Sequence, residues 1–282
     1  MSIYSGYVDI MTEAAKRAGE IVLSADSVRF GSNVEEKFGT ANFVTVYDKK
    51  VQGFLFGFLG ERFPNANFIG EEDDCDATDK LSNGLSFIID PIDGTTNFIR
   101  GIASSAISIA LLENGELICG VVYNPYSGDL YNACKGEGAY CNGKPIKTAN
   151  TPFNLCVCDC GTIPYYKNEL GDLAFEIAKA LFMNCADIRR DGSAALDVCR
   201  VASGKTDVFI EPLLSPWDYA AGALILTEAG GCIMNFDGEF PRLDGRSPIL
   251  ACASIEIYEK VMSIIGGIIG KRRGDYEKID NL

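Results

Sequence analysis

Two aspartates lie close together at the end of an apolar run. The segment Phe87–Phe98 reads FIIDPIDGTTNF, so Asp90 and Asp93 are separated by Pro91, which restricts the backbone, and one further residue. Carboxylates held this close repel each other unless they share a proton or bind a cation, and oxygen ligands alone suit a hard ion such as Mg²⁺. A pair with this spacing can also simply cap a turn, as Asp often does.

The residues after Asp93 favour phosphate binding. Gly94 and Thr95 can open a helical turn whose free N–H groups accept an anion. Ser193 and Ser215 each stand where a helix begins, with Pro216 in the first helical position and Asp218 in the first turn. Several helix N-termini are therefore expected to face one anionic ligand, although capping alone also explains these residues.

Composition excludes several kinds of chemistry. The chain has no histidine, which removes Ser-His-Asp and Cys-His systems and imidazole metal sites. Its 11 cysteines include no CxxC pair and are expected to be reduced. Cys156, Cys158 and Cys160 alternate, so on a strand they would face one way, either as a soft-metal site or, as favoured here, as small core side chains.

Charge and hydropathy limit the partners. The net charge of −14 repels nucleic acid, which is not expected as a partner, and a phosphate substrate would need bound cations to reverse the local sign. No apolar run approaches the length of a membrane span, and no export signal is evident, so a soluble cytoplasmic protein without membrane association is expected.

One nucleotide-binding motif is accidental. Residues 138–144 read GAYCNGK and match GxxxxGK, but Pro145 stands where Ser or Thr would bind magnesium, and no helix follows. Asn142-Gly143 is better explained as a hairpin turn.

The pattern of apolar residues predicts an α+β first half. Residues 5–28 have the spacing of an amphipathic helix, and Asp48 is expected to cap a second helix that ends at Pro64. The buried face of the second helix is expected to contain Val51, Phe54, Leu55, Phe58 and Leu59. From Leu85 to Cys141, short apolar runs between Asn-Gly and Ser-Gly turns predict antiparallel strands, the one that starts the series ending at Asp90.

The second half alternates between strand-like and helical runs. Strands are expected at 155–159, 206–210, 231–235 and 249–253, and helices at about 169–182, 193–203, 216–229 and 255–265. The residues from Lys271 are mostly polar and are expected to fray. These patterns predict an N-terminal α+β sub-domain, residues 1–150, and a C-terminal α/β sub-domain, residues 151–282, that share one cleft.

Four motifs together carry a family resemblance. DPIDGTTNF at 90–98 resembles the signature of the inositol monophosphatase family of metal-dependent, lithium-sensitive sugar phosphatases. Gly70-Glu71-Glu72, SPWD at 215–218 followed by YAAG, and DGSAALD at 191–197 resemble further motifs of that family, as does the stretch 120–143. The likeness covers roughly residues 5–270. It implies a layered αβαβα sandwich.

The resemblance assigns metal ligands. It places Glu71, Asp90 and the Ile92 carbonyl on a first Mg²⁺ ion, and Asp90, Asp93 and Asp218 on a second, with a third, weaker ion near Glu71. Asp90 would bridge two ions. Glu72, Asp73 and Asp74 are interpreted as a solvated acidic face.

The resemblance also assigns catalytic and substrate contacts. Glu71, Thr95 and Asp48 form the implied catalytic set, in which Thr95, hydrogen-bonded to Asp48, orients the attacking water. Water would attack in line, without a phosphoenzyme. The implied substrate contacts are Asp93, Gly94, Thr95, Ser193, Ala194, Glu211 and Asp218, although Glu211 can also be read as an ordinary acid at the end of a strand.

A loop resembling the family's mobile cover departs from its pattern. The segment KFGTANFVTVYD, which contains Lys37 and Thr45, has Asn42 where the family often has Asp and Tyr47 where a smaller residue is usual. These changes concern the affinity for the third ion and the closure of the loop over the site, and not the binding of the first two ions.

The substrate is left open among related phosphates. Myo-inositol monophosphate is the leading expectation, and fructose bisphosphate, bisphosphorylated nucleosides and histidinol phosphate are alternatives from sister enzymes. A nucleoside would need an aromatic or Arg platform, which the sequence does not assign. A non-catalytic binding or regulatory module is the alternative from another class, and a homodimer is implied by the resemblance alone.

Overall fold

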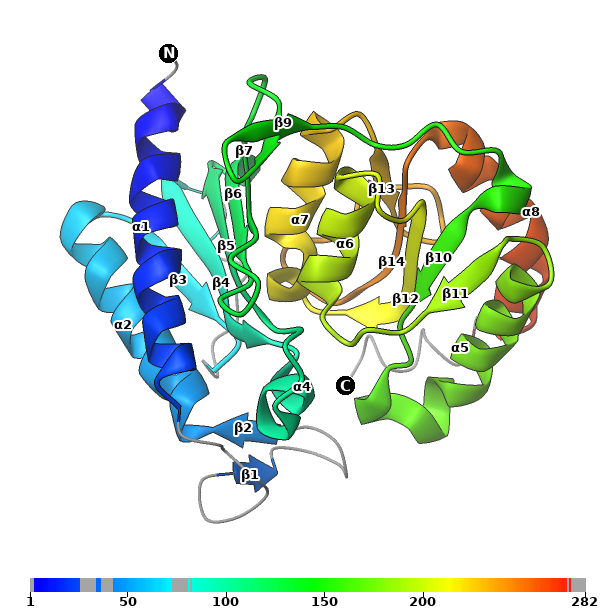
Figure 1. The fold of residues 1–282 in the computed structure, drawn as a ribbon, viewed down its shortest axis with the longest axis horizontal. Coiled ribbons are helices and arrows are strands. Elements are labelled where there is room, and N and C mark those ends of the chain that lie inside the picture. Colours follow the sequence, from blue (N-terminus) through cyan, green and yellow to red (C-terminus); the bar gives the residue numbers. More distant parts are fainter. Residues whose placement is uncertain are drawn as a thin grey trace.

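Five layers of helices and sheets build the protein. The computed structural model describes residues 3–25, 34–36, 43–72, 81, 83–272 and 274. From left to right in Figure 1, a helix pair, a sheet, a second helix pair, a second sheet and a third helix pair follow one another. The pairs are α1 (Ile3–Leu23) with α2 (Val46–Arg62), α6 (Ala194–Ala202) with α7 (Pro216–Glu228), and α5 (Lys167–Phe182) with α8 (Ile255–Lys271). The predicted αβαβα sandwich is confirmed.

The first sheet has seven strands in the order β3-β4-β5-β6-β7-β8-β9. They are β3 (Asn67–Gly70), β4 (Leu85–Asp93), β5 (Ala106–Glu113), β6 (Glu116–Tyr123), β7 (Leu130–Cys134), β8 (Ala139–Cys141) and β9 (Lys144–Ile146). Neighbours are antiparallel, as predicted for this region, except that β3 pairs parallel to β4. Asn142 and Gly143 both have positive φ, 51° and 73°, and form the predicted hairpin turn.

The second sheet is mixed, with the order β11-β10-β12-β14-β13. Its strands are β10 (Val157–Cys160), β11 (Asp187–Arg189), β12 (Val208–Leu214), β13 (Cys232–Met234) and β14 (Ser247–Cys252). β10 runs parallel to both β11 and β12, and the other pairs are antiparallel. The short, charged strand β11 has no apolar pattern, which is why sequence reasoning missed it.

Two helix boundaries differ from those predicted. The helix α1 ends at Leu23 instead of 28, and α8 continues to Lys271 instead of ending near 265. Thr45, not Asp48, caps α2, because the Thr45 side chain accepts backbone N–H groups while Asp48, at the third helical position, accepts the N–H of Thr45 in return. Asp48 is thereby fixed inside the protein, fully buried.

The central helix α7 joins the two halves. It is buried along most of its length and packs against β5 and β6 of the first sheet. A Cβ placed on Gly120 of β6 would lie 2.6 Å from the carbonyl oxygen of Ala221, so only glycine allows this approach. Asp218 lies in the first turn of α7, so the packing of α7 on the first sheet places this acid of the second half beside that sheet.

The remaining elements lie at the edges. A two-stranded antiparallel ribbon, β1 (Val34–Glu36) and β2 (Phe43–Thr45), and the short helix α4 (Thr95–Arg100) lie at one end of the first sheet (Figure 1). The two large sheets fall on either side of residue 150, and the division into two sub-domains there stays a prediction. Among the described residues, none of the helices is long and apolar enough to cross a bilayer.

Candidate active site

A bulge in β4 turns two aspartates toward the same side. Asp90 lies opposite Ser108 and Asp93 opposite Ala106, so β4 has one residue more than β5 over this interval. In a regular strand, residues three apart point to opposite faces, and the extra residue restores the same face. The prediction that the strand ends at Asp90 was wrong: β4 continues to Asp93, and Pro91 lies in the bulge, one of the few strand positions that tolerate proline.

Asp218 meets this pair from the middle layer. One carboxylate oxygen from each of Asp90, Asp93 and Asp218 lies within 4.8 Å of the other two. The start of α7 is built as the sequence predicts, with Pro216 in the first turn and the Ser215 N–H donating to Asp218 Oδ2 at 2.8 Å. Such a group of oxygens, without nitrogen or sulfur, has the donor chemistry that Mg²⁺ prefers.

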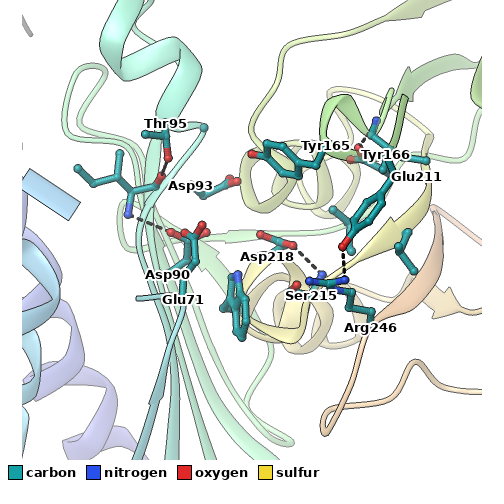
Figure 2. A pocket seen from close by; sticks show the side chains of 16 residues that line it. Glu71, Asp90, Asp93, Thr95, Tyr165, Tyr166, Glu211, Ser215, Asp218 and Arg246 are labelled. Carbon is teal, nitrogen blue, oxygen red and sulfur yellow. Dashed lines mark hydrogen bonds between the residues drawn. The ribbon is translucent and has the colours of Figure 1, made fainter. Parts of the chain in front are cut away.

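Glu71 follows the end of β3 beside these aspartates (Figure 2). The Glu71 N–H extends the strand pairing by donating to the Ile89 carbonyl at 3.2 Å. Gln52 of α2 fixes the next residue by accepting the N–H of Glu72 at 3.0 Å. A Cβ at position 70 would lie 2.3 Å from this amide oxygen, so glycine there leaves the amide in its place. Glu71 lines the same cleft as the three aspartates.

The turn after β4 leads into α4. Gly94 has φ 87° and is the N-cap of α4, and Thr95 is its first residue, as expected. The Thr95 hydroxyl lies 3.4 Å from Asp48 Oδ1 and 3.2 Å from the Ile92 carbonyl oxygen. The structure therefore brings Thr95 and Asp48 into contact, as the resemblance implies, with Thr95 lining the cleft and Asp48 behind it.

Asp93 is itself the anion at the N-terminus of α6. The Ser193 hydroxyl donates to Asp93 Oδ2, and the Ala195 N–H donates to the same oxygen at 2.9 Å. Ser193 is fully buried, and neither it nor Ala194 lines the cleft. The expectation that this helix end faces a bound anion is corrected: it faces a protein carboxylate, and any contact of Ser193 or Ala194 with substrate stays a prediction.

Glu211 approaches from the second sheet through a similar bulge. β12 has an extra residue between Glu211, opposite Ile249, and Leu214, opposite Ser247, and a proline again follows the acid. The Ile163 N–H donates to Glu211 Oε1 at 3.0 Å. A Cβ on Gly161 would lie 2.1 Å from the Glu211 carboxyl carbon, so glycine at 161 gives this side chain its space.

One cleft of about 540 Å³ is lined by Thr95 and by the acids Glu71, Asp90, Asp93, Glu211 and Asp218. The sequence did not single out several residues of its wall: Ile163, Tyr165, Tyr166, Leu213, Leu214 and Arg246. In Figure 2, Tyr166 and Arg246 lie on the side of the cleft away from Thr95, and the Tyr165 ring extends from that side toward Asp93. The available signal was positional, since the segment with both tyrosines follows β10, a parallel strand, and ligand sites gather at the carboxyl ends of such strands.

Burial makes these acids hard to ionise together. The pKa values of Asp90 and Asp218 are raised well above the ordinary range, first by burial and then by neighbouring carboxylates, with Glu71 and Asp93 acting on both. Burial also raises the pKa of Asp48 and of Glu211 to about 7. The pKa of Asp93 rises only to about 6, because Ser193 and the start of α6 stabilise its charge. A divalent cation at the three aspartates would remove the repulsion that a proton otherwise relieves.

The remaining expectations concern four residues that the structure does not describe and the alternating cysteines, for which the predicted core position is confirmed. Lys37, Asn42, Asp73 and Asp74 lie outside the described residues. The alternating cysteines 156, 158 and 160 are buried in the core, and no group that could hold a metal in the described part of the chain contains a cysteine. All ten cysteines of that part are free.

Comparisons with known proteins identify the family of this chain. The model of the inositol monophosphatase family matches residues 5–268. "Nus factor SuhB" of Pasteurella multocida is 33% identical over 256 residues, covering 90% of this chain and 95% of that protein. "Inositol monophosphatase 3" of Solanum lycopersicum is 37% identical over 238 residues, covering 82% and 87%.

Solved structures agree as well. A staphylococcal IMPase-II, SaIMPase-II, superposes with a TM-score of 0.79 at 28% identity, over 96% of this chain and 98% of that chain. The match to the family model spans nearly the whole chain, and it includes every acid that the cleft brings together. The chain belongs to the inositol monophosphatase family.

Proposed function

We propose that the protein hydrolyses the phosphate monoester of a small polyol in a Mg²⁺-dependent reaction, with myo-inositol monophosphate as the leading substrate. The observation that carries this proposal is the convergence of Asp90, Asp93 and Asp218 oxygens within 4.8 Å at a cleft. A phosphatase of this family is expected from its membership. Beyond this family-level activity, we propose the substrate, the identity of the metal and the roles of the residues.

The acids would hold two Mg²⁺ ions, or three. Glu71, Asp90 and the Ile92 carbonyl would hold one, and Asp90, Asp93 and Asp218 another. Bound Mg²⁺ supplies positive charge that neutralises the acids and offsets the charge developing on the phosphoryl group. The N–H groups of Gly94 and Thr95, at the start of α4, are placed to hold phosphate oxygens.

Thr95 and Asp48 are proposed to position the attacking water. The Thr95 hydroxyl can accept a proton from water while donating to Asp48, which lies 3.4 Å away. Burial raises the pKa of Asp48 to about 7 in the metal-free protein, so this carboxylate accepts a proton more readily than an exposed aspartate would. Its two bonds from Thr45, at 2.5 and 2.8 Å, keep the carboxylate in place during this exchange.

Relatives support a polyol or ribose phosphate as substrate. SaIMPase-II has been solved with inositol monophosphate bound and also with 2'AMP bound. In this chain, Glu211 reaches the cleft and would accept hydrogen bonds from polyol hydroxyls. Lithium sensitivity, a homodimer and a cytoplasmic location belong to the same proposal.

A second candidate role is that of a Nus factor, because several bacterial relatives have the name Nus factor SuhB. Because of these names, the absence of a nucleic-acid partner stays a prediction that rests on net charge. The cleft itself favours catalysis over a binding or regulatory module without turnover, since all the acids implied for the metal ions are present in this chain.

Phosphate release from inositol 1-phosphate, with Mg²⁺ and with EDTA, tests the proposal. The wild-type protein should turn over only with Mg²⁺, and Asp90→Asn should lose turnover by several orders of magnitude while keeping its far-UV and near-UV spectra. Asp129→Asn, a partly exposed change outside the cleft, is the control. Near-normal turnover by Asp90→Asn would refute the metal site, and no release from any phosphate ester would favour a binding module.

A further inference from the structure

The cleft contains one cation that the proposed chemistry does not use. Among the described residues that line the cleft, Arg246 is the single basic one, beside five acids. It is exposed at the start of β14, and within the described part of the chain it forms no ion pair with a carboxylate. In a protein of net charge −14, this guanidinium is the one side chain in the described lining of the cleft that attracts an anion.

Tyr166 completes an anion-binding pair with Arg246. The Arg246 guanidinium donates to the Tyr166 hydroxyl and lies 5.3 Å from the centre of its ring. A phenol that accepts a hydrogen bond still has its own proton to donate, and the guanidinium retains further N–H groups in a geometry that matches phosphate. The pair can therefore offer several donors to one anion.

The position of this pair defines what it could recognise. Arg246 and Tyr166 lie across the cleft from Thr95, where the reacting phosphate is proposed to bind (Figure 2). A second anionic group of the same substrate would be repelled by the acids elsewhere in the cleft, and Arg246 is the place where it would be attracted. The arginine also occupies the vicinity of the Tyr166 ring, so that ring is less available for stacking on a nucleobase.

We infer that Arg246 and Tyr166 form a subsite for a second phosphate, and that the protein prefers a polyol bisphosphate to the corresponding monophosphate. This inference rests on the proposed phosphatase activity, and within the proposed class of polyol phosphates it makes a bisphosphate, not inositol monophosphate, the preferred substrate. It assigns substrate selection to two residues that are not among the proposed metal ligands. The proposed metal ligands cannot select between these substrates, because they act only on the phosphate that reacts.

A matched pair of substrates tests the subsite. Phosphate release with Mg²⁺ is measured from fructose 1,6-bisphosphate and from fructose 1-phosphate, which lacks the second phosphate. The wild-type kcat/KM should be at least about tenfold higher for the bisphosphate, the lower end for hydrogen bonds to a charged group. Arg246→Gln should reduce this ratio at least about tenfold. Tyr166→Phe, which keeps the ring, should reduce it by about two- to tenfold, as for one neutral bond.

Controls separate the possible failures. Arg242→Gln changes an exposed arginine four residues away, which pairs with Asp244 outside the cleft lining, and should keep the wild-type ratio. Equal wild-type kcat/KM values for the two sugars would overturn the subsite while leaving the phosphatase intact, as would an Arg246→Gln ratio equal to that of wild type. Faster release from 2'AMP than from the bisphosphate, unaffected by Arg246→Gln, would overturn it in favour of a base-binding wall. No release from either sugar or from inositol 1-phosphate would instead refute the proposed function.

Discussion

Replacing Glu211 by Gln isolates the electrostatic cost of one cleft acid. The amide has the same shape as the carboxyl group, and its oxygen can still accept the Ile163 N–H that Glu211 accepts at 3.0 Å. Only the ionisable group is lost. Glu211 is not among the proposed metal ligands, so the comparison can be made in EDTA without a bound ion.

The magnitude follows from the raised pKa. Burial raises the pKa of Glu211 from 4.5 to about 7. The folded state therefore binds a proton more tightly than the unfolded chain, and wild-type protein loses stability as pH rises from 4.5 to 7. At about 1.4 kcal/mol for each pKa unit, the full loss is on the order of 3 kcal/mol, and it is complete above pH 7. The variant lacks this loss.

Urea denaturation of both proteins at pH 5 and pH 8 measures the effect. The free energy of unfolding of Glu211→Gln, relative to wild type, should be higher at pH 8 than at pH 5 by roughly 2 to 3 kcal/mol. Contributions from other titrating acids are shared by the two proteins and cancel to first order. Glu259→Gln, at an exposed position on α8, should show the same difference at both pH values. A Glu211→Gln difference independent of pH would refute the claim that this acid is buried at an electrostatic cost.

Three further predictions concern the same cleft. Ser193→Ala should lower the free energy of unfolding by about 1–3 kcal/mol, because buried Asp93 loses a donor, and should raise the Mg²⁺ concentration for half-maximal activity; an unchanged Mg²⁺ titration would contradict this. Gly161→Ala should displace Glu211 and raise KM for inositol 1-phosphate about tenfold or more, whereas Gly171→Ala on α5, where a Cβ would meet only Lys167 Cβ at 3.8 Å, should leave KM unchanged. Metal-free protein should have a lower Tm at pH 8 than at pH 6, since the raised pKa of the cleft acids costs stability as they ionise, and Mg²⁺ should raise Tm more at pH 8; equal Mg²⁺ effects would count against a site of ionised acids.

The local parts of the site were predictable from sequence. Ser215, Pro216 and Asp218 define a helix start whose bonds all lie within four residues, and Gly94 with Thr95 does the same for α4. Long-range partners were not predictable in this way. Ser193 donates to Asp93 across 100 positions of sequence, and neither residue type specifies the other. Here only the family resemblance, carried by several motifs at once, indicated that these segments meet.

The contact between Arg246 and Tyr166 shows most clearly what could not be predicted from the sequence. Arg246 and Tyr166 are 80 residues apart, belong to no motif recognised in the sequence, and meet because β10 and β14 both flank β12 in the second sheet. Their contact depends on strand order, which the apolar pattern does not determine. The mixed direction of that sheet, with β11 at its edge, was likewise outside the reach of periodicity.

The bulges explain why two of the acids precede proline. Asp90-Pro91 and Glu211-Pro212 each lie in a strand of a different sheet, and at each the partner strand is one residue shorter over the interval. Proline cannot donate a ladder hydrogen bond, so it is tolerated where a bulge has already broken the ladder. The local kink at the bulge redirects the acid and the residues after it. A carboxylate can thereby be fixed by rigid β-structure instead of a loop, which limits its freedom to move away from its neighbours when no cation is bound. The raised pKa of both acids is the cost of that rigidity, and the same rigidity holds Asp90 ready to coordinate Mg²⁺.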